Sequence, residues 1–404
     1  MLAEASLVAR ASDEPVERFL AMSVVALAAA RTHDPATPAL IADALAMPTF
    51  EPTPESALQL AHLMVLTGAP ERVRAIVQPA VATDVSARDR ARLLAVLGLA
   101  DAWAGSLVTG ELALREAREL AADSGQPALL CEVTGFLSKV ECFRGRLEQA
   151  AEHRATARIL AAELGSDWVA KGLLEVGVHL ALAAGDAEAH RANLEMLVGE
   201  GRGVDSGLAA EYALELAHYL ALDGDHSGAE RVMGRVDERA WPGAPALAAW
   251  RRWNLALDDP EAWDGIESAA AALDRPVECY LRARLRWLLG AYHSSAGRRG
   301  AAIRLLELAA SDYAVTGAAG FVRAVERDVP EPVRPGETSV SLGRLDRLTA
   351  AERRVAGAVC AGLSNKEIAA TLFLSVKTVE FHVSAIFRKA GVHSRAEFIC
   401  WAQG

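Results

Sequence analysis

The sequence is poor in the residues that build sheets, disulfide frameworks and metal sites. Aromatic residues make up 5% of the 404 residues, and none of the 5 cysteines belongs to a Cys-x-x-Cys pair. Alanine and leucine dominate instead, and both favour helix over strand. The cysteine spacing fits neither a zinc site nor a disulfide framework, so we expect buried, reduced thiols. The composition therefore predicts an all-α protein without a bound metal.

Long apolar runs are also missing. The longest apolar stretch near the start, residues 19–30, is too short to span a bilayer. Glu4 and Asp13 precede it instead of the basic region of a signal peptide. We therefore expect a soluble, cytoplasmic protein with no membrane partner.

Positive charge is scarce over most of the chain but not at its end. The net charge of −11 alone argues against a nucleic-acid partner. Residues 341–404, however, hold nine Lys/Arg and five Asp/Glu, a net charge of +4, which leaves −15 on the remainder. Three of the five lysines (Lys366, Lys377 and Lys389) lie in this tail. Such asymmetry indicates two domains with different partners.

A proline- and glycine-rich segment separates the two charge regimes. Residues 328–343 contain three prolines and two glycines, which block regular helix. We interpret this segment as a linker between a domain at residues 1–327 and a second domain at residues 344–404.

Before the linker, glycines recur at intervals near 40 residues, each at the end of an apolar, helix-like run. They stand at positions 68, 105, 145, 185 and 224, and again at 297, about two intervals later, with Asp-Asp-Pro at 258–260 midway. Several of these glycines have a small residue seven positions before them or five positions after them. Small residues at these positions let antiparallel helices approach closely. The pattern predicts stacked helical hairpins, an α-solenoid, with an irregular α-bundle as the alternative.

These hairpins resemble tetratricopeptide repeats that are slightly longer than usual and lack most of the aromatic positions. The first 50 or so residues fit the period poorly. Prolines at 35, 38, 48, 52 and 54 interrupt them, so we expect an irregular cap there.

The tail carries strong helix-start signals. Thr349, Ser364 and Ser394 are each followed three residues later by glutamate, the pattern of a capping box, and Ser375 suits a fourth N-cap. Glycines at 362 and 391 suit C-caps. We predict helices at residues 350–361, 365–372, 376–389 and 395–401. The short turn at 373–375 makes the second and third a helix-turn-helix, whose second helix enters the major groove.

The third helix of the tail has two distinct faces at 100° per residue. The side expected to pack on the core holds Val379, Val383 and Ile386. The opposite side holds Lys377, Phe381, Ser384 and Arg388. Cations neutralise phosphates, an apolar ring can touch a thymine methyl, and Glu380 beside this stripe can accept from a cytosine amino group. The alternative is a solvated helix face with one stray aromatic residue.

The run SNKEIAATLFLSVKTVEFHVSAIFRKAGVHSRAE, residues 364–397, resembles the LuxR/GerE/NarL helix-turn-helix family. Many spaced positions agree, including the Ser364–Ala369 stretch, Thr378-Val379-Glu380 and Gly391-Val392, while Ala390 and Phe373 depart from the usual pattern. The resemblance implies binding to double-stranded promoter DNA as a homodimer, with the last helix as dimer contact. We predict DNA binding by Lys366, Lys377, Thr378, Glu380, Phe381, His382, Ser384, Arg388 and Lys389. We predict the dimer contact at Arg395, Phe398, Ile399 and Trp401.

The region in front of the tail shows no receiver domain, no mixed α/β autoinducer-binding pattern and no P-loop, since the chain has no Gly-Lys dipeptide. A helical-repeat region followed by such a tail is similar to the MalT-like regulators without their ATP-binding half, so we expect no cofactor. The solenoid groove suits a peptide, protein or small-molecule effector. Five tryptophans at 241, 250, 253, 263 and 287 form either an aromatic ligand pocket or, as we favour, hairpin core.

The sequence thus predicts a transcriptional regulator that works at the nucleoid and senses a signal through its solenoid. The alternative is an interaction adaptor whose tail binds DNA only weakly. Nothing supports an enzyme, because no catalytic set can be identified and the histidines show no metal-binding spacing.

Overall fold

The computed structural model describes residues 14–31, 36–46, 53–199, 207–236, 244–330, 348–360, 363–372, 374–392 and 394–403, and these contain helices and turns but no strand. The chain divides into two compact units. The first is Met1–Val176 with Arg275–Cys279 and Thr316–Ala318, and the second is Gly177–Asp274 with Tyr280–Val315 and Ala319–Gly404. The predicted all-α class and the helical repeats are confirmed.

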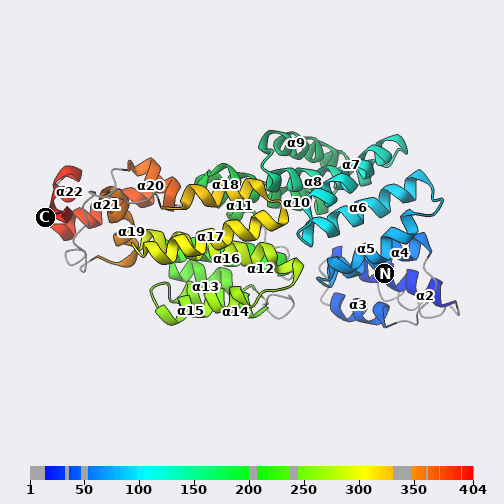
Figure 1. Ribbon diagram of the computed structural model, residues 1–404, viewed down its shortest axis with the longest axis horizontal. Coiled ribbons are helices and arrows are strands. Elements are labelled where there is room, and N and C mark those ends of the chain that lie inside the picture. Colours follow the sequence, from blue (N-terminus) through cyan, green and yellow to red (C-terminus); the bar gives the residue numbers. More distant parts are fainter. Residues whose placement is uncertain are drawn as a thin grey trace. The chain divides into compact units, whose positions relative to one another are not determined.

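The first unit is a series of antiparallel helices joined by short turns (Figure 1). In chain order these are α2 (Pro15–Arg31), α3 (Thr37–Leu45), α4 (Pro54–Leu66), η1 (Pro70–Arg72), α5 (Val73–Val81), α6 (Ala87–Trp103), α7 (Leu107–Asp123), α8 (Pro127–Arg144), α9 (Leu147–Leu164) and the first part of α10 (Asp167–Ala184).

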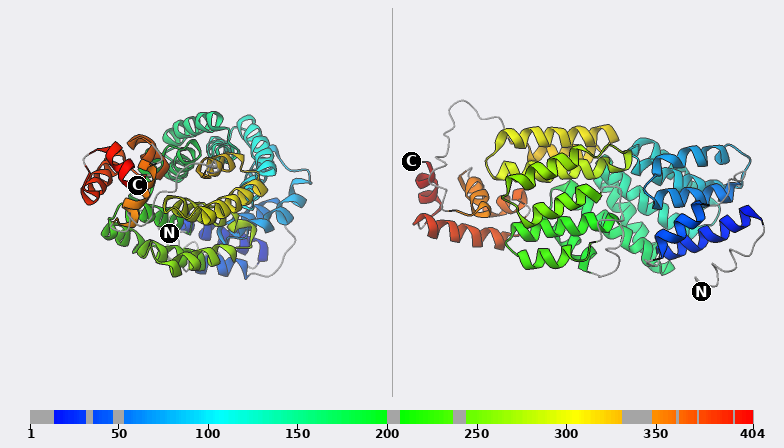
Figure 2. Two further views of the ribbon diagram at one scale, coloured as in Figure 1. Left: turned by 60° about the vertical axis from the view of Figure 1, so that its left-hand side comes forward. Right: turned by 90° about the horizontal axis from the view of Figure 1, so that it is seen from below.

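The second unit continues the hairpins and also contains the tail domain (Figure 2). Its repeats are formed by α11 (Ala187–Gly199), α12 (Gly207–Leu222), α13 (His226–Met233), α14 (Ala244–Leu255), α15 (Pro260–Ala271), α16 (Cys279–Ser295), α17 (Arg299–Thr316) and α18 (Ala319–Asp328), and η3 (Pro276–Glu278) precedes α16. The predicted linker begins where α18 ends, and its residues 331–343 lie outside the described residues.

Left-handed glycines end the helices, as the spacing predicted. All six glycines of the predicted repeat have positive φ, and so do glycines at 125, 165 and 317, which the 40-residue spacing did not reveal. After eight of these nine glycines, the N–H of the next residue donates to the carbonyl five residues earlier at 2.8–2.9 Å, as in Ser106 to Asp101 and Arg146 to Glu141. This Schellman geometry needs a residue at positive φ, where glycine carries no Cβ penalty. A helix therefore ends about every 20 residues between Gly105 and Gly185.

Small residues allow close packing within the hairpins. A Cβ added to Gly98 of α6 would lie 2.7 Å from Leu114 Cγ and 2.8 Å from the carbonyl oxygen of Gly110 in α7. Gly290 of α16 packs equally closely on Leu306 of α17. Both glycines stand seven residues before a turn glycine. The prediction that a small residue at this position lets the two helices approach closely is therefore confirmed.

Gly98→Ala is therefore expected to destabilise the first unit by about 1–3 kcal/mol through overpacking against backbone. Gly172→Ala in α10 is the matched control, because no atom lies within 4 Å of its added Cβ. That change should stabilise by about 0.5–1 kcal/mol through helix propensity. Urea midpoints of the two variants measure the difference, and equal midpoints would contradict the close packing.

The N-terminal residues form a helical pair rather than an irregular cap, so that prediction is wrong for the described residues. Pro15 and Pro54 are the first residues of α2 and α4, and α3 has a proline in its first turn. Proline is favoured there because its missing N–H has no partner within the helix. Phe19, Met22 and Ile41 form the buried core between these helices.

The tryptophans belong to the core, as favoured. Trp250 and Trp253 are 0% exposed and Trp287 is 2% exposed, whereas Trp263 is half-buried under the guanidinium of Arg298, 3.7 Å from its ring centroid. Position 241 lies outside the described residues.

Three of the four cysteines whose surroundings the structure describes are buried, as expected. Cys131, Cys142 and Cys279 are buried and form no disulfide, and Cys360 is half-buried. Burial raises the pKa of the Cys142 thiol to about 12. Among the described residues, no cluster of His, Cys, Asp and Glu could hold a metal ion.

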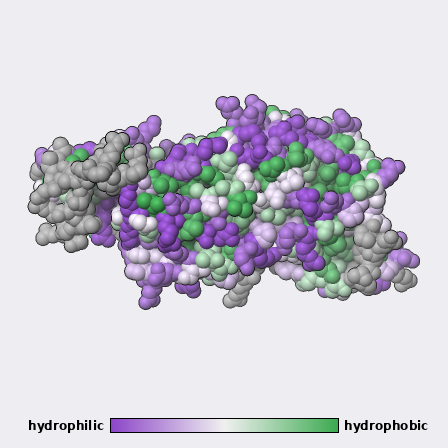
Figure 3. Space-filling view, in the orientation of Figure 1, coloured by the Kyte–Doolittle hydropathy of each residue, from purple (hydrophilic) through white to green (hydrophobic). Residues whose placement is uncertain are grey.

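The surface of the helical repeats is mixed in character. Figure 3 shows hydrophilic side chains over much of the drawn face, with apolar ones among them. In the described part of the chain, no single helix is long and apolar enough to cross a membrane, and α20 (Asn365–Leu372) and α21 (Val376–Ala390) reach that length and composition only as a bent pair.

Candidate nucleic-acid interface

The tail domain consists of four helices whose starts match the predicted capping signals. They are α19 (Ala350–Cys360), α20 (Asn365–Leu372), α21 (Val376–Ala390) and α22 (Arg395–Gln403). In the first capping box, Thr349 N donates to Glu352 Oε2 at 2.7 Å, and Glu352 N donates to Thr349 Oγ1 at 3.3 Å. Ser364 and Glu367 form the second box with the same two distances. Local side-chain chemistry thus fixes where these two helices begin.

The turn between α20 and α21 produces the helix-turn-helix. The chain bends by 110° between the two helices, within the range of 90–120° that is typical of this motif. Ser375 caps α21 by accepting from Thr378 N at 3.0 Å, and Gly391, at φ 70°, ends it. The predicted C-cap at position 362 and the turn residue at 373 lie outside the described residues.

A small apolar core holds the domain together. Val355 and Val359 of α19, Ile368 of α20 and Ile386 of α21 are all 0% exposed, and Phe398 of α22 closes the cluster. Since this core takes up the inner side of α21, the other side of that helix is free to carry polar groups.

The outer face of α21 presents the predicted stripe. Lys377, Ser384 and Arg388 are exposed, and Phe381 is 72% exposed. The opposite residues Val379 and Ile386 are fully buried, and Val383 packs partly against the same core. The two-faced helix expected from the 100° spacing is therefore present, and its solvent side offers two cations around an apolar ring. Glu380 and, on α20, Lys366 are exposed as well.

Three further residues of the predicted DNA-binding set are either buried or bonded to other side chains of the same domain. His382 is 8% exposed and its Nε2 lacks a hydrogen-bond partner. Lys389 Nζ contacts Glu352 Oε2 of α19 at 2.5 Å, and Thr378 Oγ1 is hydrogen-bonded to Ser375 Oγ at 2.7 Å. His382 could contact DNA only if the residues that now bury its side chain moved away from it.

The predicted dimer residues divide in a similar way. Phe398 is 0% exposed and stacks with Trp401 at 5.5 Å between ring centroids. Arg395 donates to the side chain of Asn365 and to the carbonyl of Leu363 within the domain. Ile399 and Trp401 are half-buried, so they retain surface for a second copy.

Comparison with known proteins agrees with this geometry. The family model described as bacterial regulatory proteins, luxR family, matches residues 346–402. These residues are a LuxR-family helix-turn-helix domain. A nitrate/nitrite response regulator homologue of Haemophilus influenzae is 51% identical over 51 residues, which are 13% of this chain and 24% of that protein. A putative HTH-type transcriptional regulator of Mycobacterium bovis is 44% identical over 52 residues, 13% of this chain and 6% of that protein.

The chain therefore spans only a fraction of the curated relatives that it matches, and the shared part is the LuxR-family domain. For the helical repeats, a Rap protein solved in complex with the competence and sporulation factor is similar in fold, with a TM-score of 0.54 and 10% identity. The match covers 78% of this chain and 86% of that one. The fold in front of the LuxR-family domain is thus a TPR-like helical-repeat fold.

Proposed function

We propose that this protein is a sequence-specific, DNA-binding transcriptional regulator. The observation that carries the proposal is the exposed stripe on α21, in which Lys377, Phe381, Ser384 and Arg388 face solvent from a folded LuxR-family domain. Cations at both ends of the stripe suit phosphates, and the ring and hydroxyl between them suit base edges in the major groove.

The partner is double-stranded promoter DNA, bound by a homodimer that acts at the nucleoid in the cytoplasm. Ile399 and Trp401 on α22 are the remaining candidates for the dimer contact, because both keep exposed surface. In this arrangement the helical repeats occupy residues 1–327, the linker residues 328–343 and the DNA-binding domain residues 344–404.

The helical repeats sense the signal, and a peptide is the effector class that we favour. The support is the fold shared with a Rap protein whose structure was solved with a bound factor, together with the concave surface that stacked hairpins provide. No cofactor and no enzymatic step enter this proposal.

Selection of bound fragments from genomic DNA tests the function. The purified chain is expected to enrich a partly palindromic site, with an affinity that falls steeply as salt rises, by a slope of about −0.9 for each phosphate contact. Lys377→Ala should reduce that slope by about one, whereas Ser384→Ala should change base preference at one position. An absence of salt-sensitive enrichment would overturn the proposal and leave the alternative, a protein-interaction adaptor.

A further inference from the structure

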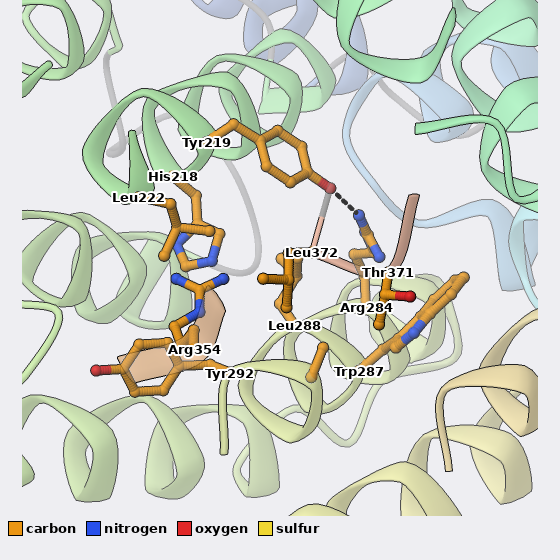
Figure 4. A pocket seen from close by; sticks show the side chains of 11 residues that line it. His218, Tyr219, Leu222, Arg284, Trp287, Leu288, Tyr292, Arg354, Thr371 and Leu372 are labelled. Atoms are coloured by element: carbon orange, nitrogen blue, oxygen red, sulfur yellow. Dashed lines mark hydrogen bonds between the residues drawn. The ribbon is translucent and has the colours of Figure 1, made fainter. Parts of the chain in front are cut away.

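The cavity that Figure 4 shows is too small for an effector. Arg354, Thr371 and Leu372 of the LuxR-family domain line it together with residues of α12 and α16. It holds about 20 Å³, room for about one water molecule. Arg354 is 6% exposed, and its guanidinium lies 5.6 Å from the ring centroid of Tyr292 in α16. A cluster of charged side chains on the first unit suits a ligand better.

Four arginines of the first unit come together where α7, α8 and α9 pack on one another. Arg115 and Arg118 belong to α7, Arg144 is the last residue of α8, and Arg146 directly precedes α9. We call these four residues the arginine cluster. Residues outside the tail carry a net charge of −15, so such a concentration of cations stands out against its surroundings.

Three members of the arginine cluster share one carboxylate. Glu111 of α7 is 8% exposed. Its Oε1 accepts from Arg115 Nε at 2.8 Å, and its Oε2 lies 3.1 Å from Arg144 Nη1 and 2.7 Å from Arg146 Nη2. Although burial opposes ionisation, these guanidinium groups, that of Arg146 foremost, hold the pKa of Glu111 below its usual value. Glu111 is therefore charged, but it neutralises only one of the three cations.

A second carboxylate is shared in the same way. Glu141 of α8 is 0% exposed, and its Oε1 accepts from Arg115 Nη2 at 3.2 Å while its Oε2 lies 2.6 Å from His153 Nδ1. His153 Nε2 lies 2.9 Å from Arg118 Nη1. Because a guanidinium can only donate, Nε2 accepts, so His153 is neutral and donates its Nδ1 proton to Glu141. Among the described residues, Arg118 pairs with no carboxylate.

The arginine cluster therefore has more charge and more donors than its acceptors can satisfy. Four guanidinium groups and two carboxylates leave a net charge of +2. Arg146 Nε and Nη2 are buried without a hydrogen-bond partner, which is unfavourable for a charged donor. The cluster can be reached by a solute, since the side chains of Arg115, Arg144 and Arg146 are 46%, 26% and 31% exposed.

Phosphate is the anion that best matches this arrangement. Guanidinium groups donate paired N–H groups to carboxylate or phosphate oxygens. A carboxylate offers two oxygens in one plane, whereas a phosphate group offers at least three in a tetrahedral arrangement to donors that come from α7, from the end of α8 and from the turn before α9. The charge of a phosphate group, about −1.5 to −2 at pH 7, also matches the excess of positive charge.

We propose that the arginine cluster binds a phosphate group, either inorganic phosphate or a small phosphate monoester. This site goes beyond the proposed function, because it involves neither DNA nor the stripe on α21. A phosphate bound there joins two consecutive hairpins, since Arg115 and Arg118 belong to one of them and Arg144 and Arg146 to the next. Binding to the folded state alone stabilises the first unit by mass action.

Calorimetric titration of the full-length chain with inorganic phosphate tests the proposal. We expect one saturable site and a thermal midpoint that rises with phosphate concentration. Arg144→Gln should weaken binding at least about tenfold, because it removes one charge-assisted donor, while Glu111 keeps Arg115 and Arg146 as partners. The matched control is Arg90→Gln, which removes the same charge from an exposed ion pair of the first unit. It should change binding by less than about twofold.

Glu111→Gln guards against loss of folding as an explanation. Glutamine keeps the size of the side chain but removes the charge that competes with phosphate for three guanidinium groups, so binding should tighten about tenfold. Misfolding cannot weaken binding in Arg144→Gln and tighten it in Glu111→Gln. Weaker binding by Glu111→Gln with unchanged helix content would contradict the excess of positive charge on which the proposal rests.

The remaining outcomes are equally decisive. Absence of saturable phosphate binding by the unmodified chain would overturn the proposal, and so would equal losses in Arg144→Gln and Arg90→Gln. Acetate that binds as tightly as phosphate would overturn phosphate as the ligand class. Glycerol phosphate and inorganic phosphate, titrated in parallel, distinguish an ester from the free anion, and saturable binding of either supports the site. None of these measurements involves DNA, so the proposed DNA-binding function stands or fails separately.

Discussion

Replacement of Glu215 by leucine is expected to lower the free energy of unfolding of the second unit by about 3–5 kcal/mol. Glu215 of α12 is 5% exposed, and its Oε1 accepts from His190 Nε2 at 2.7 Å and from Arg284 of α16. Although burial opposes ionisation, the charges of Arg284 and His190 hold the pKa of Glu215 far below its usual range. Leucine would leave the guanidinium of Arg284, itself 8% exposed, without its carboxylate.

Two further variants distinguish the effect of this buried charge pair from that of an exposed ion pair. The double change Glu215→Leu with Arg284→Met removes both charges and should recover most of the loss. Glu267→Leu breaks the exposed pair with Arg304, whose contacts are 2.6 and 2.9 Å, and should cost about 1 kcal/mol or less. Denaturant midpoints of the second unit measure all three. A double variant no more stable than the single one would contradict the role of the unpaired charge.

The features predicted from the sequence are those fixed by local chemistry. The capping boxes at Thr349 and Ser364 depend on two residues three apart, and the structure places α19 and α20 at the expected starts. The turn glycines depend on one conformational requirement, positive φ. The two faces of α21 follow from the helical period alone, which is why Phe381 was expected outside and Ile386 inside.

The features that escaped prediction depend on parts of the chain distant in sequence. Nothing in the sequence around Arg354 or His382 indicates burial, because the residues that cover them, Tyr292 and Asp223 among others, come from the repeats. Phe398 was assigned to the dimer contact because the family resemblance implies it, whereas the structure buries its ring against Phe387 of α21. Pro38 and Pro54 were taken as helix breakers, but both lie in the first turn of a helix, where proline is favoured.

Reversal of both stripe cations, Lys377→Glu with Arg388→Glu, is expected to weaken DNA binding at least about a hundredfold, equivalent to about 2.7 kcal/mol. Both side chains are exposed on the face of α21 that carries Phe381, at opposite ends of the stripe. Each carboxylate would replace an attraction to phosphate by a repulsion, so the salt dependence should flatten as well. Because neither side chain is part of the domain core, the thermal midpoint should stay unchanged.

The control for this loss is Arg88→Glu with Arg158→Glu, which alters the net charge equally at two exposed positions of the helical repeats. Fluorescence anisotropy with a selected duplex, at two salt concentrations, compares the pairs. If both double variants weakened DNA binding equally, net charge alone would govern affinity. The proposal that α21 is the DNA-contacting helix would then be wrong. A hundredfold loss confined to the stripe would locate the contact on the face where Phe381 stands exposed, and Phe381→Ala should then reduce discrimination among sites more than affinity for DNA in general.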